Sequence, residues 1–386
     1  MPFYFRLMLR MAAKSIFAYH TTGCRFSVKR FVFTITFPLW YGFLELINWA
    51  CLLLDEILFP AYRRTVAAQP VFIVGFPRSG TTYLHRLIDN DQEQFTSLKL
   101  WEIIFAPSIL QKKCFLLLGK LDRRMGRPLY RAAIRMEDKL FEGSRKMHRI
   151  SHFEAEEDEI ILIHIFSSLF LAFMFPFEEM DVFSRFDTDV APLRREKIMR
   201  FYKQCVQRHL YVFGPDKHFL SKNPASSSKI NAIYETFPDA KIICMVRHPF
   251  EAIPSAISWV SYGFKQFNTA DQQILTSRIL GLMSHWYMYP VTELDKRPET
   301  CRAVLEYDDL VKDPDGFVKR LYLRFGFPVS AGFNDFLTEE TKKAKHYKSR
   351  HDYSLGGYGL DADTIAAEFK PVFERFSFRT NEETAP

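Results

Sequence analysis

The stretch PVFIVGFPRSGTTYLHRLI, residues 70–88, decides the fold expected for this chain of 386 residues. An apolar run ends at Gly75, a turn rich in hydroxyl groups extends to Gly80, and a helical pattern begins near Thr82. Glycine lets the backbone bend so that its N–H groups point inward, and the N-terminus of a helix carries partial positive charge. The stretch therefore predicts a strand, an anion-binding loop and a helix.

The loop differs from the Walker A motif of ATPases and kinases at one position. The spacing of Gly75 and Gly80 fits that motif, but Thr81 stands where the phosphate-binding lysine belongs. The cation lies inside the loop, at Arg78, whose planar guanidinium can hold two oxygens of a phosphate or sulfate. An ordinary ATPase or kinase is therefore disfavoured, and a glycine turn without a ligand is the alternative interpretation.

The sequence Pro-Arg-Ser-Gly-Thr-Thr after a strand resembles the 5′-phosphosulfate loop of sulfotransferases that use 3′-phosphoadenosine 5′-phosphosulfate (PAPS). The arginine resembles the tyrosylprotein and bacterial branches more than the cytosolic branch, whose loop carries lysine. This resemblance implies in-line transfer of a sulfuryl group from PAPS to a hydroxyl or amine, without a metal. The residues that would hold the phosphosulfate are Arg78, Ser79, Gly80, Thr81 and Thr82.

A second segment, residues 239–259, reads as a buried strand that ends at Arg247, followed by a helix that carries Ser255. Open α/β sheets bind ligands at the carboxyl edge of their strands. In the family that the loop resembles, an arginine and a serine at this spacing hold the nucleotide's 3′-phosphate, which implies the same role for Arg247 and Ser255. Taken alone, an arginine at a strand end is more often part of a surface ion pair.

Two further segments resemble the family more loosely. Residues 304–314 look like its Tyr-Glu-Asp-Leu segment, which implies that Tyr307 lies near the adenine. Residues 345–359 are basic and then glycine-rich, and they resemble the C-terminal loop that closes over the 3′-phosphate, with Lys348 or Arg350 in contact. A half-buried tyrosine and a solvated, charged loop are the alternative interpretations.

Residues 219–224 resemble the family's central strand, whose lysine corresponds to Lys222. Cations must stabilise the charge that develops on the leaving oxygen, and Arg78 fits this role, with Lys222 as its helper. The neighbouring positions differ from the family, because Ser221 and Pro224 stand where other branches carry a glutamate or a histidine. Neither can accept the proton of the acceptor, so the base must come from elsewhere.

Three candidates for this base remain open. Glu102 lies among apolar residues that would raise its pKa toward a useful range. The acidic cluster of residues 152–159 is the second candidate, although its carboxylates also suit the first turns of an apolar helix predicted over residues 160–175. His85 is the third.

The composition limits the partners. A net charge of +7 with dispersed basic residues does not demand a polyanion, and no nucleic-acid-binding signature appears, so no nucleic-acid partner is expected. Six scattered cysteines without a Cys-x-x-Cys pair predict no metal site and suit a reducing, cytoplasmic compartment. The acceptor could be a small molecule, lipid, carbohydrate or peptide.

The N-terminal region raises a separate question. Residues 1–30 are basic with no acid, and the following 31–54 are apolar apart from Pro38, Glu45 and Asn48. The apolar run is long enough to span a membrane, but Glu45 opposes insertion. We expect helices that lie at a membrane surface through residues 31–59, or pack on the domain, in a cytoplasmic protein; a Golgi type II membrane protein is the alternative.

The alternation of strands and helices predicts an α/β fold, a P-loop-like parallel sheet flanked by helices with long helical insertions. We expect an N-terminal helical segment over 1–66, a catalytic domain over 67–379 and a disordered tail over 380–386. The runner-up functions are a nucleotide-dependent phosphotransferase and a non-catalytic, membrane-associated nucleotide-binding protein. The expected strands are 71–74, 218–222, 241–246 and 301–306; the expected helices are 82–89, a block over 112–174, 194–211, 227–236, 249–262 and 271–294.

Overall fold

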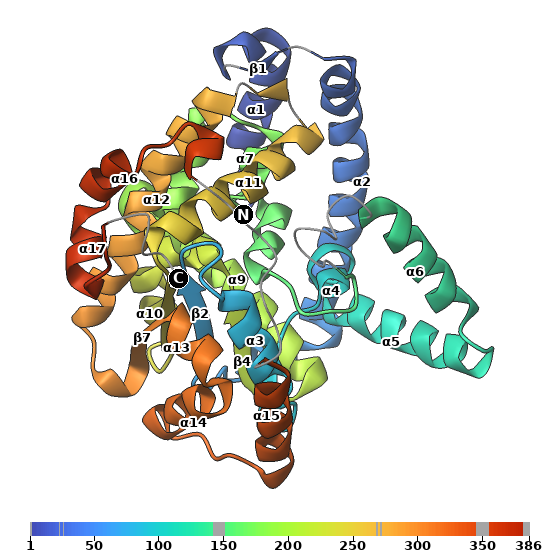
Figure 1. The fold of residues 1–386 in the computed structure, drawn as a ribbon. Helices are drawn as coiled ribbons and strands as arrows, with labels where there is room; N and C mark the ends of the chain where they lie inside the picture. Colours follow the sequence, from blue (N-terminus) through green and yellow to red (C-terminus); the bar gives the residue numbers. More distant parts are fainter. Residues whose placement is uncertain are drawn as a thin grey trace.

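A five-stranded parallel sheet lies at the centre of the computed structural model, which describes residues 2–22, 24–25, 27–141, 151–267, 269–270, 272–344 and 355–380 (Figure 1). The strands run in the order β3-β4-β2-β5-β7, and every neighbouring pair is parallel. This confirms the predicted α/β class. The strand bounds are β2 Val71–Gly75, β3 Phe95–Thr96, β4 His218–Lys222, β5 Lys241–Val246 and β7 Arg302–Glu306.

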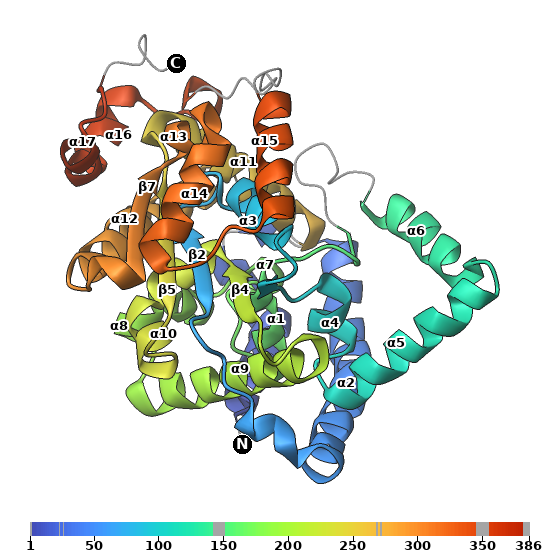
Figure 2. The same cartoon turned by 90° about the horizontal axis from the view of Figure 1, so that it is seen from below.

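Strand β2, at the centre of the sheet, is apolar throughout because helices cover both faces of the sheet. Along β2, Val71 and Ile73 belong to one buried cluster, whereas Phe72 and Val74 belong to the other. Successive side chains of a strand point to opposite faces, so a continuous apolar run is what a doubly covered strand requires. Helices α3, α13, α14 and α15 cover the first face, and α9 to α12 cover the second (Figure 2).

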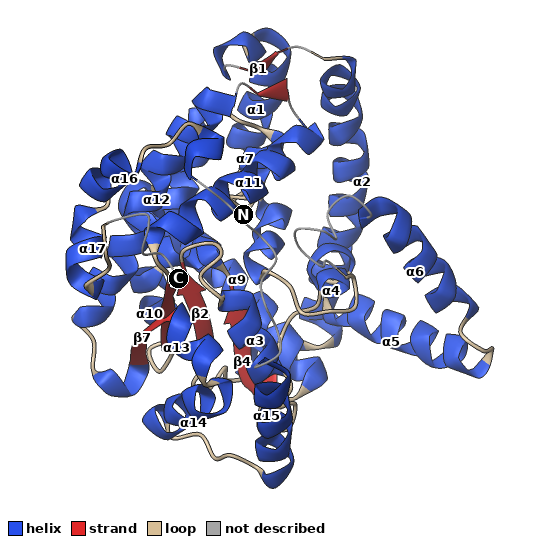
Figure 3. Ribbon diagram, viewed as in Figure 1, coloured by secondary structure: helices blue, strands red, loops and turns tan. Residues whose placement is uncertain are grey.

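Helices make up most of the chain around this small sheet, as Figure 3 shows. A two-residue antiparallel pair, β1 (Cys24–Arg25) with β6 (Thr269–Ala270), lies apart from the main sheet. The α-helices are α1 Phe5–Phe17, α2 Val28–Leu58, α3 Thr81–Asp89, α4 Leu100–Phe105, α5 Ile109–Arg124, α6 Pro128–Phe141, α7 Leu171–Met174, α8 Phe186–Asp189, α9 Pro192–Phe213, α10 Ile230–Thr236, α11 Pro249–Phe267, α12 Gln272–Asp295, α13 Tyr307–Lys312, α14 Pro314–Phe325, α15 Ala331–Ala344, α16 Ala362–Glu368 and α17 Lys370–Phe376.

The expected apolar helix over residues 160–175 is wrong. The chain forms a 3-10 helix over Asp158–Ile165 and then only the single turn of α7. Two buried carboxylates explain the difference. Asp158 accepts hydrogen bonds from Tyr202 and Ser221, while Glu159 accepts from Ser168 Oγ at 2.6 Å. These fixed partners pull the backbone inward, and Phe166 ends the segment with φ +52°.

The buried polar residues of helix α2 face the rest of the folded chain. Glu45 Oε1 lies 2.7 Å from His164 Nδ1, Asn48 accepts from Gln111 at 2.7 Å, and the Tyr41 hydroxyl donates to a backbone carbonyl at 2.6 Å. By length and composition α2 is the one helix among the described residues that could cross a membrane. In the folded chain, however, one of its faces packs on the domain from Arg30 to Asp55, where these residues are buried.

Asp55 anchors this packing at the C-terminal part of α2. Its carboxylate accepts hydrogen bonds from Ile109 N at 2.8 Å and Leu110 N at 3.0 Å, so it caps the N-terminus of α5. It also accepts from Arg208 Nε at 3.1 Å, and both charged side chains are buried. Asp55 therefore joins α2, α5 and α9.

Replacing Asp55 by Ala should destabilise the protein by about 3–5 kcal/mol, because the buried Arg208 would keep only Glu56 as a carboxylate partner and the backbone N–H groups that cap α5 would lose their acceptor. The exposed pair of Glu196 and Arg200, which lies on α9, provides the control. Glu196→Ala should cost less than about 1 kcal/mol. Chemical denaturation monitored by circular dichroism measures both. Equal losses in the two variants would show that Asp55 does not anchor the packing.

Candidate active site

The loop after β2 has a backbone that only glycine can adopt at its first position. Gly75 has φ +132°, and a Cβ there would lie 2.2 Å from the carbonyl oxygen of Met245 on β5. Its N–H donates to the buried Ser227 Oγ at 2.9 Å, and that hydroxyl donates to the Gly75 carbonyl at 3.1 Å. These contacts fix the direction in which the chain leaves the strand.

The tip of the loop turns sharply before α3. Arg78 and Gly80 both have positive φ, +72° and +85°, and Gly80 precedes the first residue of α3. The Ser79 hydroxyl is turned inward and donates to the Phe76 carbonyl at 2.6 Å. Thr81 and Thr82, at the positive end of α3, line a cavity together with Arg78. The predicted anion loop thus presents a cation, two threonines and a helix N-terminus to one space.

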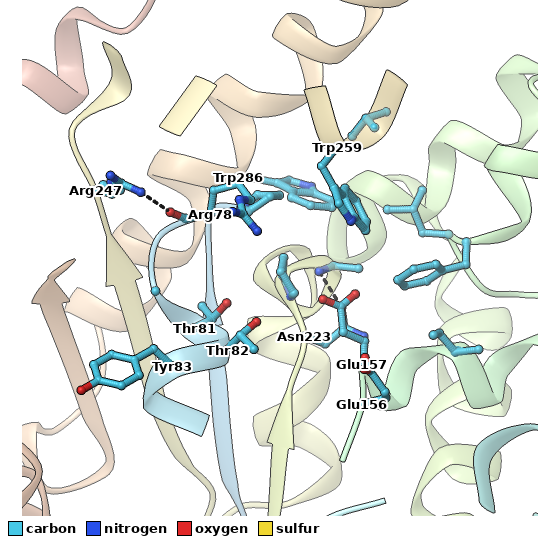
Figure 4. A pocket seen from close by; sticks show the side chains of 18 of the residues that line it. Arg78, Thr81, Thr82, Tyr83, Glu156, Glu157, Asn223, Arg247, Trp259 and Trp286 are labelled. Carbon is cyan, nitrogen blue, oxygen red and sulfur yellow. Dashed lines mark hydrogen bonds between the residues drawn. The ribbon is translucent and has the colours of Figure 1, made fainter. Parts of the chain in front are cut away.

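Residues from segments 239–259 and 304–314 contact this loop. Arg247 Nη1 donates to the carbonyl oxygen of Arg78 at 3.2 Å (Figure 4). Arg78 Nε donates to Ser255 Oγ at 3.0 Å. The Arg247 guanidinium also lies over the Tyr307 ring, 4.3 Å from its centroid. A Cβ on Gly80 would come within 2.5 Å of that same ring. The structure therefore brings together five sequence-predicted residues from three segments that are far apart along the chain.

Arg247 is held from two further directions. Glu251, one turn into α11, forms an ion pair with its Nη2 at 2.5 Å, and Tyr287 on α12 donates to its backbone carbonyl at 3.0 Å. Arg247 lines the cavity. Its charge is therefore positioned before any anion arrives, which lowers the cost of ordering it on binding.

The cavity has a volume of about 960 Å³ and two kinds of wall. Arg78, Thr81, Thr82, Arg247, Glu156 and Glu157 give one part its polar character. Figure 4 shows Trp259 and Trp286 beside Arg78. The rest of the wall is largely apolar and comes from α4, the segment after α6, α11 and α12; its members include Leu100, Ile104, Ile160, Leu169, Phe170, Phe173, Val260, Phe264, Ile279, Leu282 and Met283.

Lys222 and its neighbours lie at the carboxyl end of β4. The buried Lys222 ammonium donates to Glu157 Oε1 at 3.1 Å, and Glu157 lines the cavity. Asn223, the next residue, is fully buried and also lines the cavity. Its Oδ1 accepts from Ala225 N at 2.8 Å, while its Nδ2 has no hydrogen-bond partner among the described residues. A buried, unpartnered donor is costly, so this group is suited to an anionic ligand.

Two of the five acids in the acidic cluster reach the cavity, and Glu154, which does not line it, lies 3.5 Å from the Arg86 guanidinium. Glu156 and Glu157 reach the cavity, whereas Asp158 and Glu159 are turned into the core. Burial raises the pKa of the Asp158 carboxyl to about 6, although hydrogen bonds from Tyr202 and Ser221 act in the opposite direction. Of this cluster, only Glu156 and Glu157 can therefore meet a bound acceptor.

Glu102 does not line the cavity. It is buried in α4, where its Oε1 lies 2.9 Å from His209 Nδ1 and 3.7 Å from Lys112 Nζ. The expectation of a raised pKa is wrong: burial raises it, but the His209 and Lys112 charges outweigh burial and hold it below its usual range. Its Oε2 accepts from Lys99 N at 3.0 Å and caps its own helix.

His85 is also buried, and its Nε2 lies 3.2 Å from Ser97 Oγ. Burial lowers its pKa to about 3, and the Lys222 charge adds to this effect. It does not line the cavity. The remaining site candidates, Lys348 and Arg350, lie outside the described residues. Among the described residues, no group of three or more His, Cys, Asp or Glu side chains could hold a metal ion.

Sequence reasoning missed several residues that line the cavity or hold its charged groups in place. Asn223 had a usable signal, because it follows a strand at the ligand-binding edge of the sheet. Glu251 follows Arg247 by one helical turn, so helical spacing could have paired the two. Phe173, Trp259 and Trp286 had no such signal, since they come from three separate helices that only the tertiary fold brings together.

Comparison with known proteins agrees with this geometry. A curated relative, omega-hydroxy-beta-dihydromenaquinone-9 sulfotransferase Stf3 of Mycobacterium bovis, is 26% identical over 94% of this chain and 86% of its own length. The crystal structure of sulfotransferase STF9 from Mycobacterium avium superposes with a TM-score of 0.67, at 20% identity over 87% of this chain and 84% of the other.

A second crystal structure, sulfotransferase STF1 from Mycobacterium tuberculosis, gives a TM-score of 0.63 at 19% identity, covering 95% of this chain and 92% of the other. These two similarities concern the fold. The sequence model of the sulfotransferase family matches residues 70–331, which include the anion loop, Lys222, Arg247 and Tyr307. The chain is therefore a sulfotransferase and belongs to the sulfotransferase family.

Proposed function

We propose that this sulfotransferase takes its sulfuryl group from PAPS and transfers it to a hydroxyl group, or an amine, of a largely apolar acceptor. The observation that supports the donor is the convergence of Arg78, Ser255 and Arg247 at one edge of the sheet. PAPS carries anionic groups at both ends of one adenosine. Two cation-bearing motifs joined by hydrogen bonds suit such a ligand better than a single phosphate loop would.

The cations and hydrogen-bond donors of the site suit the anionic groups of PAPS. Arg78, Thr81, Thr82 and the N-terminus of α3 would hold the phosphosulfate, because they offer charged and hydroxyl donors at one point. Arg247 and Ser255 would hold the 3′-phosphate, and the Tyr307 ring offers a flat apolar surface for the base. The free Nδ2 of Asn223 would donate to an oxygen of the transferred group.

PAPS supplies an activated sulfuryl group, whose sulfur bonds to the acceptor oxygen as the bond to the 5′-phosphate oxygen breaks. Negative charge then grows on that phosphate oxygen, where Arg78 and the buried Lys222 can stabilise it. The acceptor proton must leave during the same step, and a carboxylate at the polar part of the cavity can take it.

We assign the proton acceptor to Glu157 rather than to Glu102 or His85. Glu157 lines the cavity, and its ion pair with Lys222 holds the carboxylate in place beside the strand end. Glu102 points at His209 and Lys112, and its backbone capping contact leaves it no access to the cavity. A base must first be within reach of the proton that it removes.

The acceptor is inferred from the apolar wall. Thirteen lining residues from Leu100 to Trp286 offer large aliphatic or aromatic surface, and few polar groups lie among them. Specific small-molecule pockets place a few polar groups within such a surface to orient one reactive end. A hydroxylated lipid or a similarly apolar alcohol fits, and the related Stf3 is named for a menaquinone substrate.

Transfer of radiolabelled sulfate from PAPS to a series of primary alcohols of increasing chain length tests this function. We expect label on the alcohols and a kcat/KM that rises by roughly threefold to fourfold per buried methylene, since each is worth about 0.8 kcal/mol. ATP labelled on its γ-phosphate should give no product. Transfer of phosphate from ATP, or no dependence on chain length, would contradict the proposal.

Arg247→Ala should weaken the binding of adenosine 3′,5′-bisphosphate by about tenfold to a hundredfold, because a hydrogen-bonded charge contact of roughly 1.5–3 kcal/mol is lost. Arg302→Ala is the matched control: its side chain is exposed to a similar degree and is paired with Asp295, but it lies at the start of β7. Isothermal titration calorimetry measures both. Unchanged binding in Arg247→Ala would remove this residue from the nucleotide site.

Glu157→Gln should lower the single-turnover rate by about 10²- to 10⁴-fold while nucleotide binding stays within a few fold, because the amide cannot accept the proton. Glu156→Gln, at the adjacent cavity-lining position, should change the rate by only a few fold. Rapid-quench kinetics with labelled PAPS measure this difference. If Glu102→Gln or His85→Gln abolishes transfer while Glu157→Gln does not, the base is elsewhere.

A further inference from the structure

The outward face of α2 is apolar, although that helix is part of the folded domain. Leu39, Phe43 and Leu46 are 71%, 68% and 70% exposed. They belong to a longer row, the α2 face, which consists of Val28, Phe31, Val32, Ile35, Leu39, Trp40, Phe43, Leu46, Ile47, Leu53, Leu54, Ile57 and Leu58. A continuous row of this size marks an interaction site, because monomeric soluble proteins rarely expose one.

Three polar residues in the second half of α2 point the opposite way. Glu45, Asn48 and Asp55 are buried against the rest of the folded chain and form hydrogen bonds there. A surface helix in water normally has the reverse arrangement, with its charges outward and its apolar stripe on the core. The outward face of α2 is therefore suited to apolar surroundings.

Helices α5 and α6 form a hairpin that projects from the body of the molecule beside the C-terminal half of α2 (Figures 1 and 2). The hairpin also exposes large apolar groups, among them Phe115, Leu117 and Leu118. Between these groups it exposes a set of cations, the hairpin cations, which are Lys113, Lys120, Arg123, Arg124, Arg127, Arg131 and Arg135.

Acids are few among the described residues of the hairpin: Glu137 is buried, and Asp138, near the C-terminal end of α6, is half-buried. The one acid within residues 109–136 is Asp122, which is buried and accepts hydrogen bonds from Leu129 N and Tyr130 N at the start of α6. None of the ion pairs formed by the described residues involves a hairpin cation. The surface is therefore apolar and positively charged at once, which complements a membrane that carries anionic headgroups.

Two other arrangements fit less well. A membrane-spanning α2 would have to leave the domain, because its contacts run from Arg30 to Asp55 and include buried ionisable groups. A symmetric dimer through the hairpin would place the same patch against itself. The hairpin cations of one copy would then face those of the other, which is unfavourable.

We propose that the α2 face and the α5–α6 hairpin bind the surface of an anionic lipid bilayer. In this arrangement the apolar side chains enter the boundary between headgroups and acyl chains, and the hairpin cations contact the lipid phosphates. The helices lie along the bilayer and do not cross it. This proposal stands apart from the proposed function, since it requires neither PAPS nor an acceptor.

Sedimentation of the full chain with vesicles tests the proposal. The protein should bind vesicles of phosphatidylcholine mixed with phosphatidylglycerol, and bind phosphatidylcholine alone much more weakly. The triple variant Lys120→Glu, Arg131→Glu and Arg135→Glu should lose about a hundredfold in affinity or more. The charge-matched control, with Lys203→Glu, Arg324→Glu and Lys370→Glu, reverses three exposed cations outside the hairpin and should bind like the unmodified protein.

The apolar contribution is tested separately. Leu39→Ser, Phe43→Ser and Leu46→Ser together should reduce vesicle binding at least tenfold, whereas the control pair Leu193→Ser and Leu323→Ser, exposed positions on α9 and α14, should not. Trp40 gives a direct readout of membrane contact, because it is the one exposed tryptophan of the chain and lies on the α2 face. Lipids brominated on the acyl chain should quench its fluorescence, and Trp40→Phe should remove most of that quenching.

Two results would overturn the proposal. The first is vesicle binding that neither set of variants weakens. The second is a protein that does not bind vesicles but forms a dimer in sedimentation velocity, with the α2-face variants dissociating that dimer. Folding of each variant is checked by adenosine 3′,5′-bisphosphate binding and by transfer to a short, soluble alcohol. These two readouts report the proposed function alone, so the failure of one proposal is distinguishable from the failure of the other.

Discussion

The site depends on the hydrogen bond from the Arg247 guanidinium to the carbonyl oxygen of Arg78. This contact joins the turn after β2 to the end of β5. The Arg78 side chain adds a second link, because its Nε donates a hydrogen bond to Ser255 on α11. Without it, two cations close together would repel each other and turn toward solvent. Glu251 and the Tyr307 ring offset part of this repulsion, so both charges remain at one edge of the sheet.

The sequence was most informative where one residue type is physically required. Gly75 has a backbone carbonyl where a Cβ would lie, and the apolar strands are covered on both faces, so both left clear patterns. The four main strands and the α/β class follow from these patterns. The two-residue β3 was missed, because two residues leave no pattern that can be distinguished from a loop.

The failures come from contacts between segments far apart in the sequence. The apolar neighbours of Glu102 suggested a raised pKa, but His209 arrives from another helix, 107 positions along the chain, and reverses the effect. Likewise, the acids after Glu157 looked like the first turn of a helix, but Tyr202, Ser221 and Lys229 hold them in the core. A local pattern cannot reveal a partner that only the tertiary fold supplies.

The apolar cavity wall and the apolar outer face of α2 are both relevant to one physical problem: the proposed acceptor and the proposed donor differ in solubility. An alcohol long enough to fill the wall around Phe173 and Trp259 partitions into bilayers, whereas a doubly anionic nucleotide stays in water. An enzyme for such a pair must therefore work where the two phases meet. The proposed membrane contact of α2, whose buried charges face the folded chain and whose leucines face outward, would keep the protein at that boundary while the Arg78 and Arg247 site stays in reach of the aqueous donor. In that arrangement the buried Glu45 and Asp55 would orient the whole molecule at the membrane as well as stabilise the packing of one helix.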